Sequence, residues 1–105
     1  MFTEISKEIA QDPWIKVVGM LQQNWAVIIE RKDDALVVFY DDGCGVFDEI
    51  SFPTYTKAKM SLLRNGFSKY FDDKELQEFI GLPYGEFKER SHPNGKIYSS
   101  GRFWH

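Results

Sequence analysis

Three short runs of β-branched and aromatic residues constrain this chain more than any other feature of its sequence. The runs cover residues 25–30, 35–40 and 46–52, and Asp, Gly and other polar residues separate them. Short strands divided by such turn-forming residues pair as antiparallel hairpins, because a tight turn returns the chain beside the strand that it has just left. We therefore predict an antiparallel β-meander over residues 25–52.

Helices are predicted before the meander. Ile5 and Ile9 lie four residues apart and indicate a short first helix. A second helix is predicted from Asp12-Pro13 to about residue 23, because Asp caps helices well and Pro fits the first helical turn. One apolar face of this second helix would carry the residues that recur at helical spacing, which are Trp14, Val17, Val18 and Leu21.

Two short helices are predicted after the meander. The first covers residues 55–63 and is followed by Asn65-Gly66, a pair typical of helix C-termini. The second is capped by Asp72 or Asp73 and ends before Pro83, since proline cannot continue a helix. Its apolar residues are predicted to line one face, and they are Leu76, Phe79 and Ile80.

A β-hairpin is predicted near the C-terminus, with strands over residues 86–90 and 96–99. Between them lies Ser91-His92-Pro93-Asn94-Gly95, where Asn-Gly suits the positive φ of tight hairpin turns. We also expect an ordered C-terminus, because Phe103 and Trp104 are large apolar residues. A chain of 105 residues is the size of one domain. The predicted fold class is α+β, with N-terminal helices, an antiparallel β-meander, two short helices and a C-terminal β-hairpin in a single compact domain, 1–105.

The sequence also suggests where the protein works. The residues after Met1 show no basic region that leads into an apolar run, and the longest apolar stretches are far shorter than the ~20 residues of a spanning helix. Cys44 is the only cysteine, so an internal disulfide is ruled out and a reducing compartment suits the chain. We therefore expect a cytoplasmic protein with no membrane partner.

Negative charge is concentrated in the meander. The chain has a formal net charge of -3, from 13 Lys and Arg against 16 Asp and Glu. Residues 30–50 carry seven of these carboxylates and only two of the cations. Such a surface repels nucleic acid, whose phosphates need Lys and Arg, and attracts basic proteins. The acidic residues also have a purely structural interpretation, because Asp pairs form turns and protect sheet edges.

Chemically reactive residues are few and are spread along the chain. Cys44 and His92 suggest a thiol and imidazole pair, but Gly-Cys-Gly is typical of a turn and the nearby carboxylates disfavour a thiolate. Phosphodiester cleavage by His92 and His105, with Lys96 or Arg102 on the phosphate, would need well-positioned imidazoles. One of these histidines lies in a predicted turn and the other is the last residue. Neither arrangement predicts an enzyme.

Metal and phosphate motifs are also missing from the sequence. Two histidines and one cysteine give no zinc spacing. Asp41, Asp42 and Asp48 offer oxygen ligands, but the Asp-x-Asp-x-Asp-Gly pattern of a calcium loop is absent. The Gly/Ser-rich residues 98–102 lack the P-loop consensus. The sequence therefore predicts no metal and no cofactor.

The whole-chain pattern is similar to that of one class of bacterial proteins. The chain is small, mildly acidic, rich in aromatic residues and of mixed α and β character, and near its end it reads Gly95-Lys96-Ile97-Tyr98-Ser99-Ser100-Gly101-Arg102-Phe103-Trp104. In this it resembles the immunity proteins of contact-dependent growth inhibition and related polymorphic toxin systems. The resemblance implies a cognate toxin domain, often a nuclease that cuts tRNA or DNA. The immunity protein would cover the active site of this toxin domain or an adjacent surface.

Charge complementarity nominates the residues that would bind such a partner. A nuclease presents cations to phosphates, and an acidic surface matches those cations. The candidate interface combines an aromatic anchor, Tyr40 or Tyr55, with the acidic residues of the meander, which are Asp33, Asp34, Asp41, Asp42, Asp48 and Glu49. The alternative function is a non-enzymatic regulatory or small-ligand-binding α+β module of a bacterial or phage operon.

Overall fold

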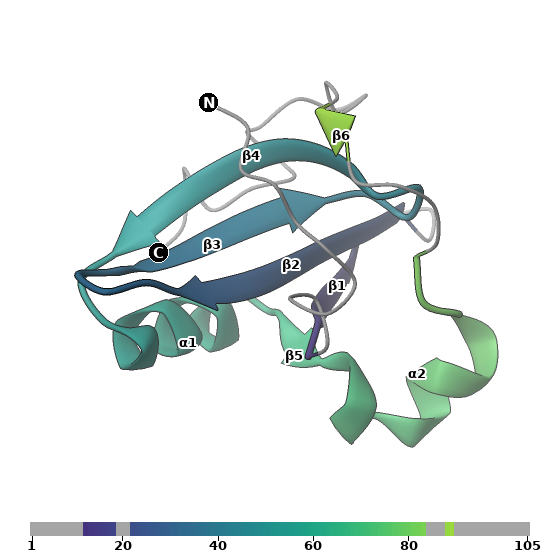
Figure 1. Ribbon diagram of the computed structural model, residues 1–105. Coiled ribbons are helices and arrows are strands. Elements are labelled where there is room, and N and C mark those ends of the chain that lie inside the picture. Colours follow the sequence, from purple (N-terminus) through teal and green to yellow (C-terminus); the bar gives the residue numbers. More distant parts are fainter. Residues whose placement is uncertain (1–11, 19–21, 84–87, 90–105) are drawn as a thin grey trace.

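A six-stranded sheet organises the described part of the chain. The computed structural model describes residues 12–18, 22–83 and 88–89. Within them the strands lie in the order β5-β1-β2-β3-β4-β6 (Figure 1). Their bounds are β1 Trp14–Val18, β2 Gln22–Glu30, β3 Ala35–Tyr40, β4 Gly45–Phe52, β5 Ser68–Lys69 and β6 Lys88–Glu89. The helical elements are α1 Tyr55–Arg64, the 3-10 turn η2 Tyr70–Asp72 and α2 Lys74–Phe79.

The predicted β-meander is confirmed. β2 pairs antiparallel with β3, and β3 pairs antiparallel with β4, so that Val38 lies between Val27 and Glu49. The tight turn between β2 and β3 is closed by a hydrogen bond of 2.8 Å from the Arg31 N–H to the Asp34 carbonyl. A bulge between Phe39 and Tyr40 shifts the register of β4.

The helix predicted from residue 12 to about residue 23 is wrong. Residues 14–18 form β1, which pairs antiparallel with β2 from residue 22 onward. Trp14 and Ile15 are adjacent and both buried, yet they belong to two different apolar clusters. That alternation has a period of two, which is the period of a strand, and β-branched and aromatic side chains favour it. The first predicted helix, at Ile5 and Ile9, lies outside the described residues.

The predicted C-terminal hairpin is not found in the described part of its sequence. There, residues 88–89 form β6, which pairs with Gly45 and Val46 of β4. This pairing is parallel, and it places β6 at the edge of the sheet, beside β4. The other hairpin residues lie outside the described residues, and so does the C-terminus that was expected to be ordered by Phe103 and Trp104.

Both helices predicted after the meander are confirmed, with their capping residues. Thr54 caps α1, since its hydroxyl accepts from the Lys57 N–H at 3.1 Å. The helix ends at Asn65, and Gly66 follows with a φ of +93°, a conformation that favours glycine. Asp73 caps α2, since Oδ1 accepts from the Leu76 N–H at 3.0 Å.

Apolar side chains cover both faces of the sheet. One face packs against α1, which lies beneath the sheet in Figure 1. Every residue of β3 is buried, as expected for a strand whose two faces are both covered. The cluster on the α1 face contains Trp14, Ala26, Ala35, Val37, Phe39, Phe47, Ala58, Leu62 and Phe67. The cluster on the opposite face contains Ile15, Trp25, Val27, Leu36, Val38, Tyr40, Val46 and Tyr70.

Candidate functional site

The acidic turns of the meander lie at opposite ends of β3. Asp33 and Asp34 precede Ala35, where β3 begins, whereas Asp41 and Asp42 follow Tyr40, where β3 ends. Strand length separates the two pairs, because successive turns of a meander alternate between the two ends of its strands. The acidic residues nominated from sequence therefore do not form one patch.

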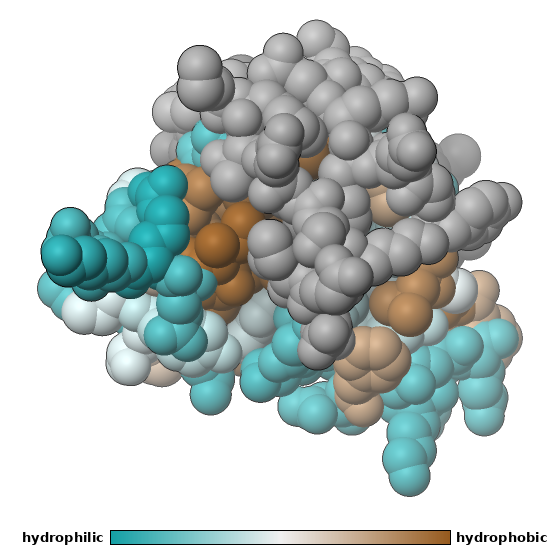
Figure 2. All heavy atoms as spheres, in the orientation of Figure 1, coloured by the Kyte–Doolittle hydropathy of each residue, from teal (hydrophilic) through white to brown (hydrophobic). Residues whose placement is uncertain are grey.

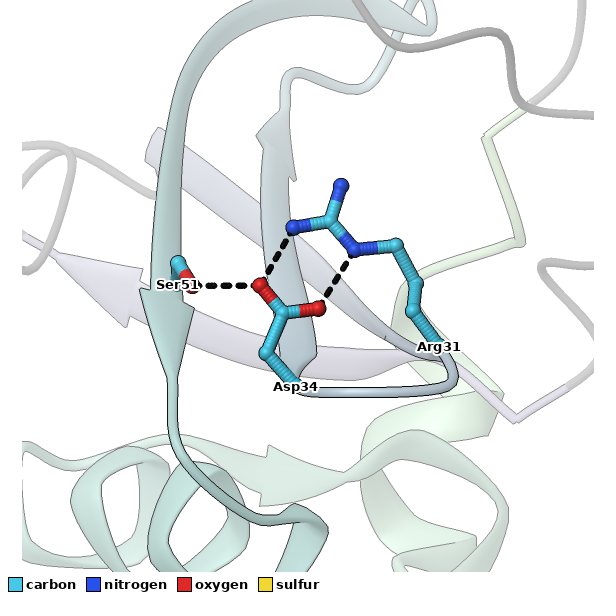
Figure 3. A network of polar contacts seen from close by, with 3 residues as sticks. All are labelled: Arg31, Asp34 and Ser51. Carbon is cyan, nitrogen blue, oxygen red and sulfur yellow. Dashed lines mark hydrogen bonds and ion pairs between the residues drawn. The ribbon is translucent and has the colours of Figure 1, made fainter.

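Asp34 is engaged in a polar network within the sheet. Its carboxylate accepts two hydrogen bonds from the guanidinium of Arg31, at 2.6 Å from Nε and 2.5 Å from Nη2. The Ser51 hydroxyl of β4 donates a third at 2.7 Å (Figure 3). The hydrogen bonds from Arg31 and then Ser51 lower the pKa of Asp34 to about 2. Asp34 thus joins the first turn to β4, and Arg31 offsets its charge.

Asp41 supports the turn between β3 and β4. It is buried, and its Oδ1 accepts from the N–H groups of Gly43 at 2.9 Å and Gly45 at 2.8 Å. Cys44, also buried, has a φ of +62°, in the left-handed region that non-glycine residues seldom adopt. The carboxylate therefore holds a turn that contains an unfavourable backbone conformation.

Asp48 and Glu49 occupy opposite faces of β4. Asp48 is buried opposite Phe39, on the α1 face, and its Oδ1 accepts from the Glu49 N–H at 2.9 Å. Glu49 is half-buried opposite Val38, on the other face. Among the described residues, its Oε2 is the one buried side-chain oxygen or nitrogen without a hydrogen-bond partner. A single partner surface could not reach both carboxylates.

The nominated residues that remain exposed are Asp33 and Asp42, one at each end of the meander. Tyr40 is buried and its ring stacks against Trp25, with 6.4 Å between centroids. Burial raises the pKa of the Tyr40 hydroxyl. Tyr55 is half-buried at the start of α1. Most of the nominated side chains are thus buried or half-buried in the fold. Their role in partner binding stays a prediction.

A different surface combines exposed apolar side chains with negative charge. It is formed by residues 70–82, which include η2 and α2 and are called the α2 arm below. Phe79 is 84% exposed, Phe71 48% and Leu82 46%. The exposed carboxylates of the α2 arm are Asp72, Glu75 and Glu78. Figure 2 shows brown apolar atoms beside teal polar atoms over this part of the molecule, where Figure 1 places α2.

The prediction that Phe79 shares one face with Leu76 and Ile80 is wrong. Leu76 and Ile80 pack against the core, but the Phe79 side chain points away from it. The helix ends at Phe79, and Ile80 has an extended backbone with φ -127° and ψ 121°. Ile80 therefore lies outside the helix, and the helical spacing that would place it on one face with Phe79 does not apply. Glu75 lies one helical turn before Phe79 and Glu78 lies directly before it, and these charges were the signal that this position faces water.

Ring packing attaches the α2 arm to the core, and hydrogen bonds hold the arm together. The Tyr70 hydroxyl donates to the Ile80 carbonyl at 2.5 Å. The Gln77 side-chain amide donates to the carbonyls of Tyr70 and Asp73, both at 3.1 Å. The Tyr70 ring packs on Trp25 with 5.1 Å between centroids. The inner side of the arm is therefore fixed to the sheet, while Phe79 is presented outward.

Positive charge surrounds the exposed apolar residues of α1, in contrast to the negative charge on the α2 arm. Met60 and Leu63 are about half exposed on this helix. Their neighbours on α1 are the cations Lys57, Lys59 and Arg64, and α1 contains no acidic residue. The described molecule therefore presents two apolar surfaces of different sign, acidic on the α2 arm and basic on α1.

Within the described residues, no group of three or more His, Cys, Asp or Glu is placed to hold a metal ion. Neither α1 nor α2 has the length and hydropathy that a helix needs to cross a bilayer, and these are the α-helices of the described segments. Comparison of the chain with protein-family models, with curated proteins and with solved structures finds no match.

Proposed function

We propose that this protein is an immunity protein, which binds a cognate toxin domain and neutralises it without catalysing a reaction. The observation that carries the proposal is a phenylalanine, Phe79, that is 84% exposed among carboxylates. Aromatic side chains are common anchors of protein interfaces, because they bury a large area at little cost in side-chain entropy. Exposed apolar surface rimmed by polar residues is typical of protein-binding sites.

The charge of the chain favours a nuclease as the toxin. A nuclease must present Lys and Arg to the phosphates of its substrate, and an acidic protein is attracted to the same groups. The net charge of this chain is -3, and exposed carboxylates occur at both ends of the meander and on the α2 arm. Coverage of the active site or of an adjacent surface would then keep tRNA or DNA from the enzyme.

Growth of bacterial cells tests the proposal directly. Cells would express the toxin domain encoded beside the gene for this chain, with and without this protein, and the purified pair would be titrated by calorimetry. We expect restored growth and nanomolar binding that weakens as salt is raised, because attraction between opposite charges is screened by ions. Absence of both rescue and binding would refute the immunity function.

A further inference from the structure

We infer that the α2 arm is the surface that docks on the toxin. The arm fits an apolar pocket of the toxin whose rim carries Lys and Arg. This inference rests on the proposed function and names its contact surface. The three exposed apolar side chains of the α2 arm are Phe71, Phe79 and Leu82, and none of the residues of α2 is fully buried. Burial of these side chains against a partner would remove apolar surface from water, which favours association.

Charge selects the kind of partner. Glu75 lies one helical turn before Phe79, and Glu78 lies beside it in the sequence. Asp72 adds a third exposed carboxylate, and Lys74 is the cation of the arm. An aromatic anchor with a rim of carboxylates matches a pocket whose rim carries cations, the chemistry that a phosphate-binding protein presents. An acidic partner would be repelled by the same rim.

The α1 surface is the natural comparison within the same molecule. Met60 and Leu63 are exposed there as well, but Lys57, Lys59 and Arg64 surround them. A cationic partner would be repelled at α1 and attracted at the α2 arm. Of the two exposed apolar surfaces of the described residues, the arm is therefore the one with the charge that suits a nuclease.

The attachment of the arm to the core favours tight binding. The Tyr70 ring packs on Trp25 of the core, and the hydrogen bonds from Tyr70 to the Ile80 carbonyl and from Gln77 to the Tyr70 carbonyl hold the arm together. A surface that is ordered before binding loses less conformational entropy when the complex forms. Phe79 is presented by this ordered segment, as an anchor residue requires.

Substitutions on the outer side of the arm test the inference. Phe79→Ser removes the anchor, and the double change Glu75→Lys with Glu78→Lys reverses the charge of the rim. All three positions are exposed, so the melting temperature should stay within a few degrees of the unchanged protein. We expect Phe79→Ser to weaken binding of a catalytically inactive toxin domain by about 30-fold. The charge reversal should weaken it further at low salt and remove rescue of growth.

Two matched controls separate the α2 arm from the other surfaces. Leu63→Ser removes an exposed apolar residue from the basic α1 surface, and Asp33→Asn with Asp42→Asn removes the exposed charges of the meander. We expect both controls to bind with nearly the affinity of the unchanged protein, apart from a modestly slower association for the meander variant. If the unchanged protein binds and the arm variants bind equally well, the arm is overturned as the docking surface while the immunity function stands.

A peptide probe tests the arm independently of the toxin. Backbone amide signals would be followed by NMR while a short amphipathic peptide of Lys and Leu is added, with a Glu and Leu peptide as the control. We expect shifts confined to residues 70–82 and seen with the Lys peptide alone. Shifts that avoid the arm would overturn the inference, whatever the toxin does. Self-association that Phe79→Ser abolishes, with toxin binding unchanged, would assign the arm to a second copy and would also overturn it.

Discussion

At the scale of single residues, the acidic side chains of the meander first serve the fold. Asp41 accepts hydrogen bonds from two backbone N–H groups of a turn that also holds Cys44 at a φ of +62°. Asp41→Ala leaves those donors without this acceptor and should lower the free energy of unfolding by about 1–3 kcal/mol. Asp41→Asn keeps an oxygen acceptor and should cost less. Urea denaturation measures both changes.

The neighbouring Asp42 provides the control for that prediction. Asp42 is exposed, so Asp42→Ala should change the free energy of unfolding by no more than about 0.5 kcal/mol. Equal effects at residues 41 and 42 would show that charge, and not the hydrogen bonds of Asp41, governs the stability of this turn.

The pairing of Asp34 with Arg31 makes part of the stability depend on pH. The pKa of Asp34 is lowered from 3.8 to about 2 in the folded protein, first by the hydrogen bond from Arg31. A carboxyl group whose pKa is lowered by folding stabilises the protein above its unfolded pKa, and this contribution is lost as the pH falls through the folded pKa. The contribution of Asp34 should therefore be complete above about pH 4 and absent below about pH 2.

Comparison with Asp34→Asn measures this contribution. The free energy of unfolding of the unchanged protein should exceed that of the variant at about pH 5, and the difference should shrink as the pH approaches about 2. Asp33→Asn, which removes one exposed charge from the same turn, controls for net charge. A difference that stays constant with pH, or one that Asp33→Asn reproduces, would contradict the role of the network.

At the scale of elements, the α2 arm should loosen separately from the sheet. Tyr70→Phe keeps the ring on Trp25 but removes the hydrogen bond to the Ile80 carbonyl, which should cost about 1 kcal/mol. Amide hydrogen exchange should become faster at Gln77 and Ile80, whose N–H groups donate within α2, and should change little in β3.

Tyr55→Phe, at a half-buried tyrosine outside the arm, is the control for Tyr70→Phe. It should leave exchange at Gln77 and Ile80 unchanged. Faster exchange in β3 and in α2 to the same extent would show that the arm opens only when the whole sheet does.

The elements that could be predicted from sequence are those with local signals. The meander was readable because charged turns divide its strands, α1 because Asn65-Gly66 marks its end, and α2 because Asp73 caps its start. β1 was misread because Trp14, Val17 and Val18 fall at helical spacing, while pairing with β2 decides their conformation. A strand was expected around β6, but its parallel pairing with β4 could not be foreseen, since that pairing joins residues far apart in the sequence.

The candidate site shows the same limit. The sequence shows where the acidic residues lie along the chain. It could not show that Asp41 and Asp48 are buried and that Asp34 pairs with Arg31. The spacing of Phe79 from Leu76 placed it on one face with Leu76 and Ile80. Its exposure follows from where α2 ends, and an element boundary is the feature that sequence patterns fix least well.

At the scale of the whole molecule, one sheet with apolar clusters on both faces should unfold in a single step. Leu62 belongs to the cluster on the α1 face and is fully buried. Leu62→Ala should lower the free energy of unfolding by about 2–5 kcal/mol, because it leaves a cavity as well as removing apolar contacts. Leu63→Ala, at the exposed neighbouring position, should cost far less.

Two tryptophans report on the two faces of the sheet. Trp14 lies in the cluster that contains Leu62, and Trp25 lies in the opposite cluster, so their indole N–H signals can be followed separately by NMR during urea denaturation. Every residue of β3 is buried, and its alternate side chains belong to both clusters, so that loss of one cluster exposes the strand that supports the other. We therefore expect Leu62→Ala to shift both indole transitions to the same lower urea concentration. A shift confined to the Trp14 signal would show instead that the α1 face opens on its own and that the two clusters are separate folding units.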